Sequence, residues 1–180
     1  TLINVHGSIA FRGNVDNPID NATINNNTAN YDALSSFCAF VEVNNVEHVE
    51  AAYNVVHGIS AANNAGGWGE AQVFQFWSQA GPWSVDIHDN DLSDNFQCIN
   101  IKANSGEWIQ RRVPSGTINN NNLSNNSEFG LSLDFYGYNP ENPDIASLDA
   151  TLNYWGGNPG EITGAIVAPW YSDEVGGTLE

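Results

Sequence analysis

Three side chains of this sequence could act together in acid–base chemistry. Glu42, Lys102 and Asp134 hold outward positions in separate short runs, and stacking those runs gives a column of Glu42, Trp77, Lys102 and Asp134. A lysine amine beside carboxylates could abstract a proton from a uronic acid whose own carboxylate is neutralised by a metal ion. Alternatively, Lys102 pairs with Asp134 and lies over Trp77, each contact contributing about 0.2 to 1 kcal/mol. We favour this structural interpretation and keep the three residues as candidate catalytic groups.

A second candidate site is acidic. Asp89, Asp91 and Asp94 follow one another closely in the chain, next to Asp86 and His88. Oxygen ligands at this density could hold Ca²⁺, although the glycine and terminal glutamate of an EF-hand loop are missing. The alternative is a solvated acidic bend that binds nothing.

Aromatic and cationic side chains gather in two long insertions. The candidates for ligand contact are Trp68, Trp77, Trp83, Trp108, Arg111 and Arg112. Flat aromatic faces beside a pair of guanidinium groups could stack on sugars or bind an acidic partner. More often, such aromatic residues fold a long loop back onto the rest of the domain.

Charge restricts the classes of partner. The chain carries 21 acidic residues against four Lys and Arg, a net charge of -17, so nucleic acid and anionic membranes would be repelled. A salt-rich habitat and an acidic secreted protein that binds divalent cations both fit this balance. No run approaches the roughly 18 to 20 apolar residues of a membrane span, and the missing initiator Met suggests a processed or excised piece of a longer product.

Four sequons for N-glycosylation are present, at Asn21, Asn26, Asn122 and Asn125. They are usable if the chain is exported to a compartment that holds the machinery. Asn is the dominant residue of the sequence, so several sequons would arise by chance.

An internal repeat must position these groups. Residues 85–95 align with residues 116–126, and the shared pattern is apolar-x-x-Asn-x-apolar-x-x-Asn. Weaker copies give five in all, with the first Asn of each at Asn27, Asn54, Asn90, Asn121 and Asn153. Alternating apolar runs without helical periodicity predict strands. We therefore predict a single all-β domain over residues 1–180, a right-handed parallel β-helix of about five turns. In each turn the repeated Asn is expected to take the left-handed conformation at a bend and to stack its amide on the next Asn, which forms a ladder.

After each bend a second alternating run predicts a broad sheet. Its inward residues are expected to be Ala39, Val41, Val43, Phe74, Phe76, Ile99, Ile101, Leu131 and Leu133. Alternation places Cys38 and Cys98 outward, with the strand holding Val73 between their turns. Two steps of about 4.8 Å exceed the roughly 7 Å that a disulfide tolerates, so free thiols are expected.

The segment at residues 148–171 carries the most specific signal. It contains Asp149-Ala150-Thr151, Asn153-Tyr154-Trp155-Gly156 and Pro169-Trp170. This series resembles the "DAT-x-N-W-W-G … G-P … P-W" ending of right-handed parallel β-helix repeat proteins from bacterial and archaeal cell surfaces. Tyr154 replaces the first Trp of that pattern, and Pro159-Gly160 stands where it has Gly-Pro. The resemblance implies the fold and an extracellular, cell-surface location, and the broad family has no single activity.

The leading hypothesis is a non-enzymatic structural or adhesive surface module, whose partners are other copies of itself, in filaments or a surface layer, or surface glycans. The alternatives are a polysaccharide lyase or hydrolase that uses the Lys102 column, and a carbohydrate-binding module. No cofactor is implied with certainty, and Ca²⁺ is the one candidate.

Overall fold

The computed structural model describes residues 2–3, 9–14, 16–31, 38–63, 71–78, 84–103, 115–135, 148–157, 159, 162 and 165–179. In these residues the chain is all-β, and the only helical segment is one 3-10 turn, Ala61–Asn63. The alternating apolar runs predicted strands, and the internal repeat predicted that they pair in parallel; all pairs between named strands are parallel.

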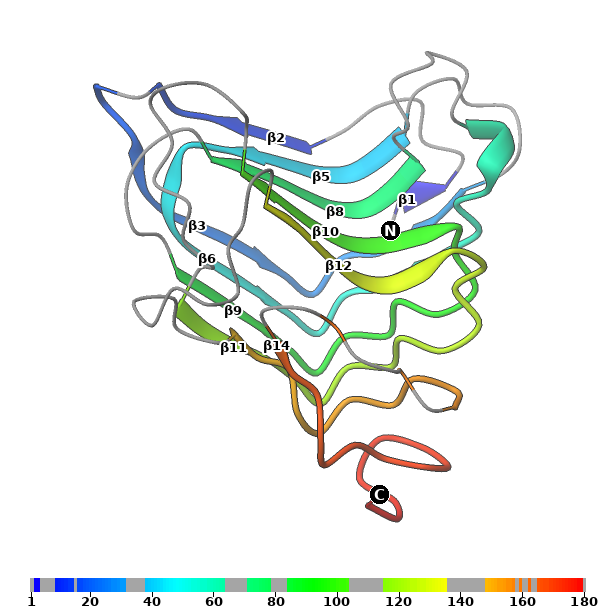
Figure 1. Ribbon diagram of the computed structural model, residues 1–180. Coiled ribbons are helices and arrows are strands. Elements are labelled where there is room, and N and C mark those ends of the chain that lie inside the picture. The colour runs from blue at the N-terminus through cyan, green and yellow to red at the C-terminus, as the bar shows by residue number, and fades with distance from the viewer. Residues whose placement is uncertain are drawn as a thin grey trace.

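Three parallel sheets run side by side through the molecule (Figure 1). The broad sheet contains, in spatial order, β12 (Phe129–Phe135), β10 (Gln97–Ala103), β8 (Ala71–Ser78), β5 (Cys38–Asn44) and β2 (Ile9–Arg12). The second sheet contains β14 (Ala165–Ile166), β13 (Leu148–Asp149), β11 (Ser115–Asn119), β9 (Ser84–His88), β6 (Val46–Ala52) and β3 (Ile19–Asn25). The third contains β1 (Leu2–Ile3), β4 (Thr28–Asn30) and β7 (Val55–His57).

The chain visits the three sheets in a fixed order. From β3 it passes to β4 and then to β5, and the same order recurs through β6, β7 and β8. Single parallel bridges extend the third sheet, joining Val55 to Asp91, Asp91 to Asn122, Asn122 to Tyr154 and Tyr154 to Tyr171. These parallel sheets are compatible with the predicted parallel β-helix.

The repeated Asn residues form a column of hydrogen-bonded amides. Asn27 Nδ2 donates to Asn54 Oδ1 at 3.0 Å, and the bonds from Asn54 to Asn90, Asn90 to Asn121 and Asn121 to Asn153 measure 2.9, 2.8 and 3.0 Å. The last four of these Asn are buried. The column satisfies buried amide groups from one strand layer to the next, which is why Asn recurs here while its neighbours vary.

The left-handed residue of each bend lies one position earlier than predicted. Positive φ angles occur at Asn26, Tyr53, Asp89, Asn120 and Leu152, and not at the Asn of the column. The column Asn uses its own N–H as a donor to the next Oδ1, for example Asn54 N to Asn90 Oδ1 at 2.9 Å. The sharp change of direction therefore falls on the preceding residue. In three of the five copies this residue is Asn or Asp, the non-glycine types that adopt the left-handed region most readily.

The core lies between the sheets, and the residues predicted to point inward fill it. Eight of the nine predicted inward residues are buried, and Leu133 packs partly buried against the same cluster. One prediction was wrong: Cys98 was expected outward, and alternation with the inward residues Ala39 and Val41 would place Phe40 outward as well, yet both Cys98 and Phe40 belong to the core. The bridges pass from Ala39↔Gln72 to Val41↔Phe74 without pairing Phe40, and the broad strands curve visibly (Figure 1). Simple alternation fails there because a curved strand does not keep a period of two.

Candidate functional site on the broad sheet

The register of the broad sheet sets out two rows of side chains that run across the strands. The first row contains Glu42, Gln75, Asn100 and Ser132, and the second contains Asn44, Trp77, Lys102 and Asp134. The predicted column of Trp77, Lys102 and Asp134 is therefore in register. Glu42 is not part of it, because Glu42 pairs with Gln75 and Asn44 takes the place beside Trp77. The structure describes only the backbone of Trp77, Lys102 and Asp134.

The first row lies on the face opposite the core. Gln75 stands between Phe74 and Phe76, and Asn100 stands between Ile99 and Ile101, all four of which are core residues. Since side chains alternate along a strand, the two amides point away from the core. They are nevertheless only 2% and 4% exposed. These polar side chains are thus enclosed on the outer face of the sheet.

Three amide atoms in these rows are buried without a hydrogen-bond partner. They are Asn44 Oδ1, Gln75 Nε2 and Asn100 Oδ1. A buried polar atom left unpaired costs about 1–3 kcal/mol, and each such atom in a native protein calls for an explanation, such as a bound ligand or ordered water. Two acceptors and one donor, on neighbouring strands of one face, form the best-defined candidate binding site in the part of the chain that is described.

Glu42 is held at one edge of this site by an arginine. Arg12 Nε and Nη2 donate to the two carboxylate oxygens of Glu42 at 3.1 and 2.7 Å. The hydrogen bond and the charge of Glu42 raise the pKa of Arg12, which stays cationic. A carboxylate held by both of its oxygens is poorly placed to exchange protons, so this geometry does not favour Glu42 as an acid or base.

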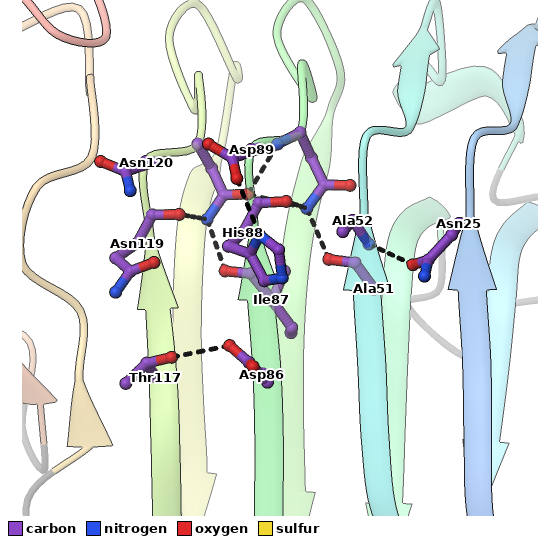
Figure 2. Close-up of polar contacts among 12 residues, drawn as sticks. Asn25, Ala51, Ala52, Asp86, Ile87, His88, Asp89, Thr117, Asn119 and Asn120 are labelled. Atoms are coloured by element: carbon purple, nitrogen blue, oxygen red, sulfur yellow. Dashed lines mark hydrogen bonds and ion pairs between the residues drawn. The ribbon is translucent and has the colours of Figure 1, made fainter.

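The predicted acidic site is not gathered into a metal centre. Asp91 Oδ1 accepts from Ser93 Oγ and Asn122 Nδ2, and its Oδ2 lies 3.1 Å from His57 Nε2. Asp89 Oδ2 lies 2.8 Å from His88 Nδ1 (Figure 2). Among the described residues no group of three or more His, Cys, Asp or Glu could hold a metal ion. Asp89 and Asp91, without Asp94, instead line an open hollow of about 410 Å³ that also includes Glu174 and Tyr154.

A serine, a histidine and an aspartate meet on the third sheet, although their spacing in the sequence gave no sign of it. Ser93 Oγ lies 2.8 Å from Asp91 Oδ1 and 3.4 Å from His57 Nε2. In a hydrolase triad the acid and the serine contact opposite ring nitrogens of the histidine. Here both face Nε2, and the serine has a nearer acceptor in the carboxylate. The arrangement is therefore structural and does not activate a nucleophile.

Two carboxylates also face each other on the outer side of the second sheet. Glu50 of β6 and Asp86 of β9 are register partners. Each carboxylate has its hydrogen-bond donor on the side away from the other carboxylate. Asn25 Nδ2 of β3 donates to Glu50 at 2.9 Å, and Thr117 Oγ1 of β11 donates to Asp86 at 2.9 Å (Figure 2 draws the second bond). The two donors separate the like charges, which gives this pair a structural explanation.

Most of the predicted ligand-contact residues lie outside the described part. These are Trp68, Trp83, Trp108, Arg111 and Arg112. The three unpaired amides were not predicted as a site. The signal that could have revealed them is a polar residue held between two core residues in consecutive copies of the repeat.

Comparison with known proteins adds no assignment. No family model, no curated protein and no solved structure matches the chain. In the described residues, no helix has the length and apolar character needed to cross a membrane.

Proposed function

We propose that this chain is an extracellular, non-enzymatic adhesive module that binds surface glycans across its broad sheet. We further propose that it is a right-handed parallel β-helix of about five turns. The recurring order of three parallel sheets supports the fold. The observation that carries the function is the group of buried, unpaired amide atoms at Asn44, Gln75 and Asn100.

A neutral sugar matches these groups chemically. One hydroxyl can accept from Gln75 Nε2 and donate to Asn44 Oδ1 or Asn100 Oδ1. A polyanion is disfavoured, because the chain carries a net charge of -17. Adjacent parallel strands lie about 4.8 Å apart, so successive units of an extended glycan could contact successive strands.

The experiment is a glycan array on the whole chain, followed by titration calorimetry on the glycans that bind. Gln75→Leu and Asn100→Leu should each weaken binding by about tenfold or more, since each removes a hydrogen bond worth about 1.4 kcal/mol. Neither change should reduce thermal stability, because an apolar group replaces an unpaired polar one. Asn119→Leu, on the second sheet, is the matched control and should leave affinity unchanged. Binding that survives both broad-sheet changes would rule out this site.

A second candidate function is proton abstraction by Lys102. It is favoured by one observation, that the register places Lys102 directly between Trp77 and Asp134. Turnover of an acidic polysaccharide should then disappear in Lys102→Ala and fall strongly in Lys102→Arg. Turnover that continues unchanged in Lys102→Ala would remove the assignment.

Self-association belongs to the same adhesive proposal. Terminal strands of parallel sheets carry backbone groups that a neighbouring copy could pair with. Electron microscopy across a salt and Ca²⁺ series should show filaments or lattices. Discrete monomers throughout the series would leave glycans as the proposed partner and exclude copies of the chain.

A further inference from the structure

Two of the four sequons begin at bends of the same geometry. Asn26 and Asn125 are exposed and left-handed, with φ angles of 60° and 57°. The Asn that follows each of them is hydrogen-bonded to a neighbouring layer: Asn27 donates to Asn54 in the amide column, and Asn126 Oδ1 accepts from Asn95 N at 2.9 Å outside that column. In each Asn-Asn pair the second side chain is hydrogen-bonded within the fold, while the first side chain is exposed to solvent.

Asn21 is the third accessible sequon. It lies on β3 beside the buried Ala22, and both Asn21 and its sequon partner Thr23 are exposed. Its side-chain amide makes no hydrogen bond to the part of the chain that the structure describes.

Asn122 differs from the other three because both polar atoms of its amide form hydrogen bonds within the fold. Its Nδ2 donates to Asp91 Oδ1 at 2.9 Å, and its Oδ1 accepts from Ser124 Oγ at 2.7 Å and from Ser124 N at 3.2 Å. Ser124, the hydroxyl residue of this sequon, is 5% exposed. One Nδ2 hydrogen could stay on Asp91 after modification. A glycosylating enzyme could reach the hydroxyl of this sequon only after Ser124 Oγ leaves Asn122 Oδ1 and the bend opens, because Ser124 is buried.

We propose that the folded protein carries N-linked glycans at Asn21, Asn26 and Asn125 and none at Asn122. In this modification the amide nitrogen attacks the anomeric carbon of a lipid-linked oligosaccharide. A C–N bond forms, the bond from that carbon to the phosphate oxygen breaks, and the amide loses one proton. The four sequons fall into two structural classes. Asn21, Asn26 and Asn125 have exposed amides, whereas the amide of Asn122 is hydrogen-bonded through both its nitrogen and its oxygen.

The inference rests on the proposed export and is independent of the proposed glycan ligand. The three acceptors lie on β3 and on bends, outside all five strands of the broad sheet. Sugars attached there would not lie on the strands that carry Gln75 and Asn100. Loss of glycan binding and loss of modification are therefore separable results.

The test is secretion of the whole chain from a yeast host, followed by peptide mapping of the folded, soluble fraction after enzymatic deglycosylation in heavy-oxygen water. Asn21, Asn26 and Asn125 should carry the isotope label in most molecules, and Asn122 should carry none. Asn21→Gln, Asn26→Gln and Asn125→Gln should each remove one glycan mass, whereas Asn122→Gln should remove none. Circular dichroism of each variant checks that it has folded. A labelled Asn122 in folded protein, or an unlabelled member of the other three, would overturn the proposal.

Discussion

Asn121 shows how much of the fold can depend on one side chain. Its Nδ2 lies 2.9 Å from Ile87 O, 3.0 Å from Asn119 O and 3.0 Å from Asn153 Oδ1. Its Oδ1 accepts from both Asn90 N and Asn90 Nδ2. The residue is fully buried, so no water can replace a lost partner.

Asn121→Ala should therefore lower the free energy of unfolding by about 3 kcal/mol, because it leaves several buried groups unpaired at about 1–3 kcal/mol each. Asn119→Ala, a half-buried neighbour whose backbone bond is retained, should cost less than about 1 kcal/mol. Urea unfolding followed by tryptophan fluorescence measures both. Equal losses for the two variants would mean that the amide column contributes little.

Cys98 is a second residue whose behaviour follows from its place. It is a free thiol, fully buried in the core, and desolvation raises its pKa well above the ordinary value. The reactive thiolate is therefore scarce in the native state at any pH near neutrality.

In a Cys38→Ser background, alkylation of Cys98 at pH 8 should be slow and should accelerate only as denaturant unfolds the chain. At each pH the native rate should stay far below the rate of the unfolded chain, because the thiol reacts only in molecules that have opened. Mass spectrometry of timed samples gives the rates. Labelling of the native protein at the rate of an exposed thiol would contradict the burial.

At this scale the sequence predicted which residues build the column, because buried amides must be paired and the repeat displays them. It did not predict that Cys98 points inward or that the left-handed residue precedes the column. Both depend on the direction of the backbone at a bend, which an alternating pattern of residue types does not encode.

At the scale of the strands, pairing determines which side chains lie opposite each other. β6 and β9 bring Glu50 and Asp86 opposite each other, a position where like charges destabilise a sheet. Their separate donors, Asn25 and Thr117, reduce the repulsion without removing it.

Asp86→Asn should stabilise the protein by about 0.5 kcal/mol at low salt, since the amide oxygen still accepts from Thr117 and the like charge is gone. The gain should shrink as salt screens the pair. Asp149→Asn is the matched control, because Asp149 accepts from Thr151 N and Oγ1 and has no carboxylate opposite it. Thermal melts at two salt concentrations test this, and a loss of stability in Asp86→Asn would contradict it.

The strands themselves were predictable from short alternating runs, and most inward residues were identified correctly. The register between strands was predictable only in part. Lys102 and Asp134 were aligned correctly, whereas Glu42 was placed two residues out, because a run of alternating residues fits its neighbour equally well after a shift of two. The unpaired amides escaped prediction because enclosure of the outer face is a property of the folded chain.

Over the whole molecule the dominant feature is charge. A net charge of -17 on 180 residues opposes compaction through self-repulsion. Screening shortens the reach of this repulsion from about 30 Å at 0.01 M salt to about 3 Å at 1 M.

The melting temperature should therefore rise steadily with ionic strength over this range. NaCl and NaBr should give the same rise at moderate concentration, because screening depends on ionic strength and not on the identity of the ion. Differential scanning calorimetry measures the rise. A flat or falling melting temperature would remove the case for a protein adapted to a salt-rich habitat.

The amide column has one further property, which comes from its direction. Every Nδ2 to Oδ1 bond in it points the same way, from Asn27 towards Asn153. Aligned amide dipoles add, as they do along a helix, and bonds in a chain polarise one another. The molecule therefore has an electrical axis along the bends between its second and third sheets. The Asn27 end carries a partial negative charge and the Asn153 end a partial positive charge, so an approaching ion meets a different environment at each end.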